Sequence, residues 1–296
     1  MSAHVPGPWP ALPYDGWRGT RDTLHMEMQM LGKVRVALSD PEPEFAHVAL
    51  YVTARGISTG PVPSVRGIFE VEADFFDHRV YVRTAWGEVH SVPLAARPVA
   101  VFWTEFNAAL AAAGIDVALA DMPQEVPDPI PFPDDTVHAE YDPAAARRFW
   151  EILTLVQPVL ADYRAAYLGR VTPVQFFWGH IDLAVTRFSG RPCDPPENAD
   201  FLDRGTYDAE QISVGWWAGS DNFPEPAFYA YSYPKGDGIE EVALEPAAAF
   251  WSAELGEHLL RYDDVRNEPD PGVPVRAFLD SFYGAASVRC AWDQLG

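Results

Sequence analysis

Three short segments in the first half of this chain match three segments in the second half, in the same order. The matched pairs are 31–34 with 168–171, 47–53 with 180–186, and 98–103 with 246–251. Self-similarity on this scale constrains a fold strongly, because each copy must form one structural unit. We therefore expect a tandem duplication within the 296 residues.

The hydrophobic periodicity of the first half changes from that of a helix to that of strands. Apolar residues recur at helical spacing over 20–33, with Gly32 at the predicted end, and then alternate at period two in several short runs between 34 and 94. Pro98 and Gly114 bracket a second predicted helix over 99–113. One further strand is expected at 115–119.

The second half repeats this plan in the same order. Asp142 is suited to be the N-cap of a long helix with Pro143 at its first position, and Pro158 predicts a kink or a break in that helix. The remaining expected elements are strands at 174–188, 211–217, 227–233 and 240–244, a helix beginning at Pro246 and a last helix at 275–283.

These patterns predict an α+β fold in which each half is an antiparallel sheet of about four strands flanked by helices. We expect a pseudo-two-fold cleft between the halves. The predicted organisation is a first repeat over 1–121, a proline-rich crossover over 122–141 and a second repeat over 142–296, all packed as one globular unit.

Charge and motif content exclude several functional classes. The chain has 43 acidic and 21 basic residues, a net charge of −22, which disfavours nucleic acids and anionic membranes as partners. It has no apolar run of the length that a membrane span needs, which is about 20 residues. The two cysteines lack a metal or redox spacing, so we expect a cytoplasmic protein. Nucleotide-binding, zinc-protease and serine-hydrolase motifs are missing.

Strand parity selects the first candidate catalytic residues. Successive side chains of a strand point to opposite faces, so the apolar positions 181, 183 and 185 leave His180 and Asp182 together on the other face. His47 holds the matching position in the first half. The predicted chemistry is acid–base catalysis with Asp182 orienting His180, or binding of a divalent metal by His47, His180 and Asp182 with further ligands. A structural role for these residues is the alternative.

Three arginines beside glycine turns, Arg55, Arg187 and Arg191, are candidate clamps for a carboxylate or phosphate. Ion pairs with the many acidic residues are the alternative for all three.

Three further residues are candidate ligand-binding groups. His25 and Gln29 are four residues apart and share one helix face. Trp216 and Trp217 are consecutive in a strand, so one of them, taken here as Trp217, lies on the polar face as a pocket wall.

The segments 24–33, 50–56 and 176–191 resemble a bacterial family catalogued as a domain of unknown function (domain of unknown function 5996). The resemblance covers nearly the whole chain. It implies no activity, cofactor or catalytic residue.

Two functional hypotheses follow from these residues. The first is an enzyme, a hydrolase or lyase without a nucleotide cofactor, that acts on a small anionic molecule through a His/Asp/Arg cleft. The second is a non-catalytic protein that binds a small molecule or another protein. Replacement of His180 by alanine distinguishes the two, because only the first predicts loss of turnover or metal with the fold intact.

Overall fold

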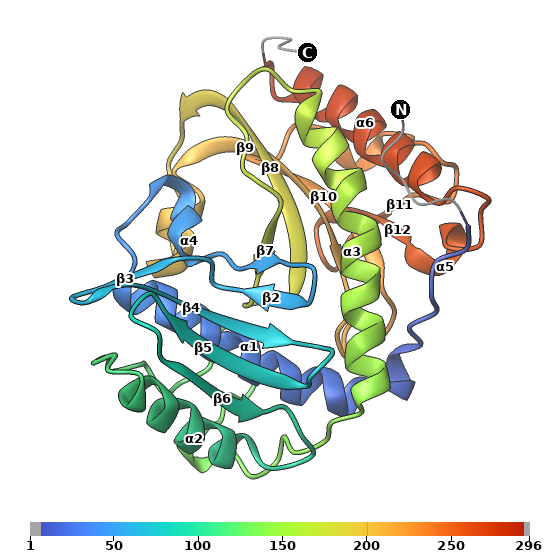
Figure 1. Cartoon of the computed structure of the whole chain (residues 1–296). Coiled ribbons are helices and arrows are strands. Elements are labelled where there is room, and N and C mark those ends of the chain that lie inside the picture. Colours follow the sequence, from blue (N-terminus) through green and yellow to red (C-terminus); the bar gives the residue numbers. More distant parts are fainter. Residues whose placement is uncertain (1–6, 200, 293–296) are drawn as a thin grey trace.

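The computed structural model describes residues 7–199 and 201–292 and contains two antiparallel sheets (Figure 1). The first sheet has the order β1-β2-β4-β5-β6, with β3 paired to β4. Its strands are β1 (Tyr51–Val52), β2 (Gly56–Ser58), β3 (Val62–Ser64), β4 (Gly67–Asp74), β5 (Arg79–Thr84) and β6 (Val89–Pro93).

The second sheet also has six strands, in the order β11-β12-β10-β9-β8-β7. Its strands are β7 (Gln175–Phe177), β8 (Asp182–Pro192), β9 (Ala209–Trp217), β10 (Ala227–Tyr233), β11 (Phe250–Ser252) and β12 (Glu257–Arg261).

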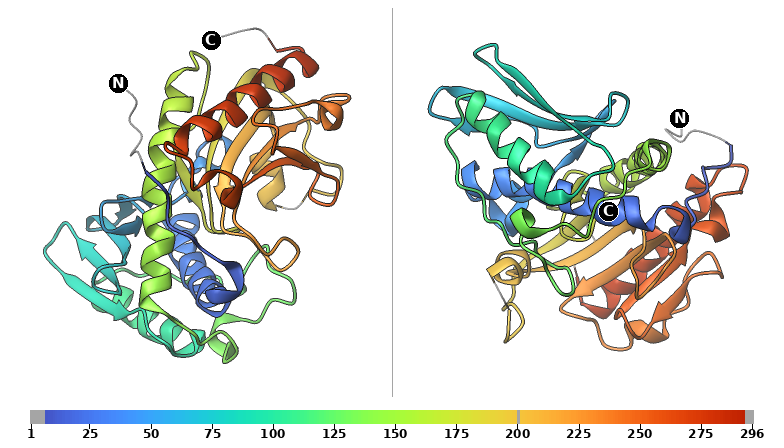
Figure 2. Two further views of the ribbon diagram at one scale, coloured as in Figure 1. Left: turned by 90° about the vertical axis from the view of Figure 1, so that its right-hand side faces the viewer. Right: turned by 90° about the horizontal axis from the view of Figure 1, so that it is seen from below.

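Four long helices cover one face of each sheet. α1 (Arg18–Leu38) and α2 (Val99–Ala112) pack on the first sheet, whereas α3 (Pro143–Ala165) and α6 (Gly272–Arg289) pack on the second (Figures 1 and 2). The shorter helices are α4 (Phe201–Thr206), α5 (Tyr262–Val265), η1 (Tyr14–Gly16), η2 (Pro43–Val48), η3 (Phe132–Asp134) and η4 (Ile239–Glu241). None of the helices within the described ranges is long and apolar enough to cross a membrane.

The two sheets are joined edge to edge through the strands β1 and β7. The backbone amides of Leu50 and Phe176 each donate to the other residue's carbonyl at 2.8 Å. The Trp178 indole adds a hydrogen bond of 2.9 Å to the carbonyl of Val48. One continuous hydrophobic core contains buried residues of both halves.

The α+β class, the start of one helix and the end of another agree with the sequence. Asp142 caps α3 by accepting a hydrogen bond of 2.9 Å from the amide of Ala144, and Pro143 is the first helical residue. Gly114 follows α2 with a φ of 77°, a left-handed conformation that glycine adopts without strain.

Several local predictions are wrong. α1 does not end at Gly32 but continues to Leu38, because the Arg35 guanidinium donates to the carbonyls of His47 and Thr59 and anchors the last turns. Gly32 serves packing instead, since a Cβ there would lie 2.1 Å from the Trp178 indole nitrogen. Of the two alternatives predicted for Pro158, a break is wrong, because α3 continues through this residue to Ala165. Residues 115–119 form no strand.

The matched segments adopt different structures. Residues 31–34 lie in α1 but 168–171 precede β7 without helix, and 98–103 open α2 whereas the stretch after Pro246 leads into β11. Residues 47–53 end η2 and form β1, whereas 180–186 form a turn and β8. The helix predicted after Pro246 is therefore wrong, because Phe250 and the two residues after it pair with β12. A tandem duplication does not follow from these matches.

Candidate functional site

A cavity of about 310 Å³ lies on the face of the second sheet opposite α3 and α6. Its floor comes from alternate residues of β8, β9 and β10, and its rim from the crossover, the turn before β8 and the segments around α4 and β12. On β8, Leu183 and Val185 are buried toward the helices, while Asp182, Ala184 and Thr186 line the cavity. The parity expected from the sequence is the one observed in β8. The cavity is hollowed into one sheet, not set between pseudo-symmetric halves.

The Asp182 carboxyl is held by a tyrosine from two strands away. Tyr229 on β10 donates from its hydroxyl to Oδ2 of Asp182 on β8 at 2.5 Å. Gly215 on β9 lies between them in the register, opposite both Ala184 and Tyr229. A Cβ on Gly215 would lie 2.5 Å from the Tyr229 ring, so the absence of a side chain there allows the phenol to cross β9.

A second carboxyl lines the same cavity. Glu257 begins β12, and no ion pair or side-chain hydrogen bond to it is found in the described part of the chain. Burial raises the pKa of Glu257 to about 7, and the neighbouring Asp182 carboxylate adds to the rise. Burial also raises the pKa of Asp182 to about 6, although His180 and the Tyr229 hydrogen bond oppose the change. Two carboxyls of one cavity thus titrate near neutral pH.

Uncharged polar side chains complete the floor of the cavity. Gln175, Gln211 and Ser213 are 1%, 2% and 3% exposed. The hydroxyls of Ser213 and Thr186 are 3.0 Å apart and hydrogen-bonded. A polar floor of this kind is typical of a ligand site, since buried polar groups are costly unless something bonds to them.

Aromatic side chains form the walls. Trp217 stacks on Phe223 with ring centroids 5.5 Å apart, and Tyr229 stacks on Tyr231 at 6.3 Å. Trp217 and both tyrosines line the cavity, as the parity of β9 predicts for Trp217.

His180 lies at the rim, with its side chain 65% exposed. Its Nδ1 is 3.6 Å from Oε2 of Glu125, a residue of the crossover that also lines the cavity. Asp182 has Tyr229 as its hydrogen-bond partner. The cavity therefore contains both predicted residues, but not as the expected hydrogen-bonded His–Asp pair.

His25 and Gln29 lie beneath the rim and do not line the cavity. His25 donates from Nε2 to the carbonyl of Gly179 at 2.8 Å, and burial lowers the pKa of this ring to about 3, so it is neutral. The Gln29 carboxamide bonds both the amide and the carbonyl of Gln124, at 2.8 and 2.7 Å. The two residues position the backbone immediately before His180 and Glu125.

His47 is not a cavity residue. It ends η2, where its Nδ1 accepts a hydrogen bond of 3.2 Å from the amide of Glu42. The structure thus does not bring His47 together with His180 and Asp182. Over residues 7–199 and 201–292, no group of three or more histidine, cysteine, aspartate or glutamate side chains is placed to hold a metal ion.

The three candidate arginines are also engaged away from the cavity. Arg55 pairs with Asp74 and Asp77 on the first sheet. Arg187 is buried on the helix side of β8, where its guanidinium lies 3.6 Å from the ring centre of Tyr163 and donates to that residue's carbonyl. Arg191 pairs with Glu210 at 2.7 Å. An arginine clamp is not a feature of this cavity.

Sequence reasoning did not select Tyr229, Glu257, Gln211 or Glu125. The alternation in 227–233 places Tyr229 on the face opposite Phe228, and this alternation could have identified Tyr229 as a residue of the polar face. Glu257 was missed because a helix was predicted to begin at Pro246, although Gly256, which has a φ of 71° in the turn between β11 and β12, was an available signal.

Comparison with known proteins identifies a family and no activity. No curated protein and no solved structure matches the chain. One family model, described as a family of unknown function (DUF5996), matches residues 9–295, including every residue of the cavity. The chain belongs to this family, as the resemblance in segments 24–33, 50–56 and 176–191 indicates.

Proposed function

We propose that the protein binds a small molecule in the cavity on the outer face of the second sheet. The observation that carries this proposal is the Asp182–Tyr229 pair, which is built across a side-chain-free position, Gly215, and faces a cavity with a polar floor. Ligand sites of proteins are concave, about 300–1,000 Å³ in volume, mostly apolar and furnished with a few fixed polar groups. This cavity has those properties.

The second candidate function is catalysis by proton transfer at Asp182. This candidate corresponds to the enzyme hypothesis of the sequence analysis. An acid or base is most effective when its pKa lies near the working pH. Burial raises the pKa of Asp182 to about 6, and the Tyr229 hydroxyl orients the carboxyl. A hydrolase or lyase reaction without a nucleotide cofactor fits these groups. The anionic substrate expected from the arginines has no support in the cavity, because lysine and arginine are missing from its described lining.

Filling the cavity tests the binding proposal. Ala184 and Ser213 lie on its floor, so Ala184→Leu and Ser213→Val reduce its volume. We expect a fragment library, screened by ligand-observed NMR, to yield compounds that bind the native protein and not the two variants. Ser91→Val, on β6 of the first sheet, is the matched control and retains binding.

Circular dichroism and thermal melts establish that each variant is folded before it is compared. Equal binding of all fragments by native protein and both folded variants contradicts the proposal. Absence of any bound fragment in the native protein contradicts it as well.

A further inference from the structure

We infer that the ligand of the cavity is an organic cation: an ammonium group held between the carboxyls of Asp182 and Glu257, carried by an aromatic or other apolar group against the cavity walls. This inference rests on the proposed function and adds the chemical class of the ligand.

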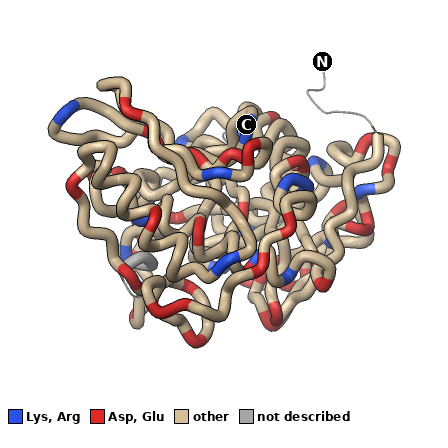
Figure 3. The backbone as a smooth tube through the Cα atoms, turned by 60° about the horizontal axis from the view of Figure 1, so that its bottom comes forward, with Lys and Arg blue, Asp and Glu red and all other residues tan. Residues whose placement is uncertain are grey.

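The first argument is the sign of the charge around the cavity. Glu125, Asp182 and Glu257 supply three carboxyls, and His180 at the rim is the one ionisable nitrogen among the described lining residues. Acidic residues are spread over the whole backbone (Figure 3), so net charge alone does not single out this place. What distinguishes it is carboxyls turned into a hollow without a lysine or arginine beside them.

The second argument is a polar side chain at the floor of the cavity. Gln211 is 2% exposed as a residue and lines the cavity, and no hydrogen bond of its carboxamide is found in the described part of the chain. Its polar atoms are not among those fully enclosed without a partner, so the amide faces the cavity, where it can bond to a ligand. The amide oxygen accepts hydrogen bonds and therefore suits the N–H groups of an ammonium.

The third argument is the aromatic wall. Trp217, Tyr229 and Tyr231 present rings to the same space as the carboxyls. Ring faces attract cations within about 6 Å, and sites for organic ammonium ions combine such rings with carboxylates. A neutral ligand can donate a hydrogen bond to the carboxyls but gains no attraction between opposite charges, and an anionic ligand is repelled by them.

The electrostatics of the cavity agree with this assignment. Burial raises the pKa of both carboxyls, and a neighbouring carboxylate adds to each rise: Glu125 for Asp182, and Asp182 for Glu257. A bound cation compensates the negative charges and lowers both pKa values. The other titratable groups that line the cavity are Glu125, His180, Tyr207, Tyr229 and Tyr231.

Three matched series of probes test the inference by isothermal titration calorimetry at pH 8. They are benzylamine, 2-phenylethylamine and 3-phenylpropylamine, the corresponding alcohols, and the corresponding carboxylates. We expect the best amine to bind at least about tenfold more tightly than its alcohol, and the carboxylates to bind most weakly. If the alcohols bind as tightly as the amines, the inference of a cationic ligand is wrong, although the cavity is still a binding site.

Absence of binding by all nine probes overturns the cation inference if the library fragments still bind and are displaced by filling the cavity. If those fragments fail too, the proposed function fails with it. The two failures are therefore distinguishable.

Glu257→Gln and Asp182→Asn provide the charge test within the protein. Each variant is expected to weaken amine binding by about five- to tenfold and to leave alcohol binding unchanged. Glu225→Gln, an exposed carboxyl paired with Arg261 outside the cavity, is the control and has no effect. Amine affinity in the native protein should rise from pH 5 to pH 8, as the two carboxyls ionise, and then level off. A flat profile, or equal losses for amines and alcohols, contradicts the inference.

Discussion

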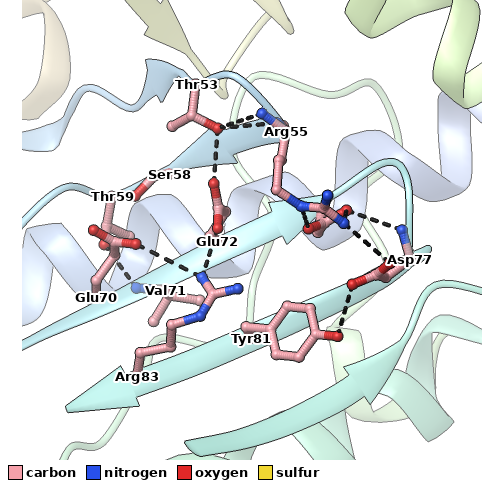
Figure 4. A network of polar contacts seen from close by, with 12 residues as sticks. Thr53, Arg55, Ser58, Thr59, Glu70, Val71, Glu72, Asp77, Tyr81 and Arg83 are labelled. Carbon is pink, nitrogen blue, oxygen red and sulfur yellow. Dashed lines mark hydrogen bonds and ion pairs between the residues drawn. The ribbon is translucent and has the colours of Figure 1, made fainter.

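The faces of the two sheets that no long helix covers both carry acidic side chains. The two faces differ in whether a basic side chain compensates those acidic groups. On the first sheet, acidic and basic groups are paired with one another (Figure 4). Asp74 is fully buried, yet it is bonded by Arg55 and by the amides of Phe76 and Asp77, at 2.8 and 2.9 Å. Glu72 accepts from Thr53 at 2.7 Å and from Arg83 at 2.5 Å.

On the second sheet, Asp182 is buried and Glu257 is partly buried, but the described residues that line their cavity include no lysine or arginine. Accordingly, the hydrogen bonds and the Arg55 charge hold the pKa of Asp74 below its usual range, whereas burial raises the pKa of Asp182. A face whose charges are all satisfied stabilises the fold. Carboxyls around a cavity without a basic partner are available for a ligand. This contrast is the reason that we propose the binding site on the second sheet.

The largest expected effect is the loss of a satisfied charge on the first sheet. Asp74→Ala leaves Arg55 and two backbone amides without their acceptor, and we expect a destabilisation of about 3 kcal/mol. Because the pKa of Asp74 is lowered in the fold, its contribution is present above its unfolded pKa, near 4, and is lost as the pH falls further. Urea unfolding at pH 7 and pH 3 measures both effects.

Asp77→Ala is the matched control for Asp74, since its carboxyl is half exposed and also pairs with Arg55. It should cost less than about 1 kcal/mol. Equal losses for the two variants would show that burial of the satisfied charge is not what stabilises this face.

The next largest change in stability is expected at Gly215, the position that allows Tyr229 to reach Asp182. Gly215→Ala places a methyl group within 2.5 Å of the Tyr229 ring, and we expect a destabilisation of about 2 kcal/mol together with displacement of the phenol. Gly284→Ala in α6 meets open space and should instead stabilise the protein by about 0.5–1 kcal/mol. Thermal melts and a crystal structure of the first variant test this, and an unmoved Tyr229 would contradict it.

Removing the charge of Asp182 should change the free energy of unfolding in the opposite direction to removing the charge of Asp74. Asp182→Asn retains an acceptor for Tyr229 but removes a buried charge, so we expect a stabilisation of about 1–2 kcal/mol at pH 8. The pKa of Asp182 is raised in the fold to about 6, so native stability falls as the pH rises from about 4 to 6. The gain in the variant should therefore vanish at pH 4. If the variant is less stable than the native protein at pH 8, the ionised Asp182 carboxylate stabilises the fold and the prediction is wrong.

The smallest change in stability is expected for Glu70, on the helix-free face of the first sheet. Glu70 lies 3.8 Å from Arg83, and its side chain is 42% exposed. Glu70→Gln should change the free energy of unfolding by less than about 0.5 kcal/mol, because exposed ion pairs are weak and screened by salt. Denaturation in 0.05 and 0.5 M salt checks this, and a change above 1 kcal/mol would show that the network of Figure 4 acts as a unit.

Local patterns predicted those parts of the fold that short-range physics controls. Asp142 and Pro143 begin α3, Gly114 follows α2, and the strand over 227–233 is the observed β10, because caps and alternation act within a few residues. Predictions failed where distant contacts decide. α1 passes Gly32, against which Trp178 packs, and Arg35 anchors the end of α1 on His47 of η2 and on Thr59 in the loop between β2 and β3.

The candidate site was predictable to the extent that it depends on one strand. Parity placed Asp182 on the cavity face and Trp217 on a neighbouring wall. It could not select Tyr229 or Glu257, because their nearness to Asp182 depends on which strands pair and in which register. The same limit explains His47, which shares a sequence pattern with His180 but lies in a 3₁₀ helix.

The sequence by itself determined the α+β class, the family, the net charge of −22 and the alternation that directs Asp182 to the cavity face. These properties depend on composition and on neighbours along the chain. Only the tertiary structure decided that Asp74 and Glu72 are paired with arginines on the first sheet, whereas the described lining of the cavity around Asp182 and Glu257 contains no lysine or arginine. Charge compensation depends on distance in space, and the order of the strands sets that distance.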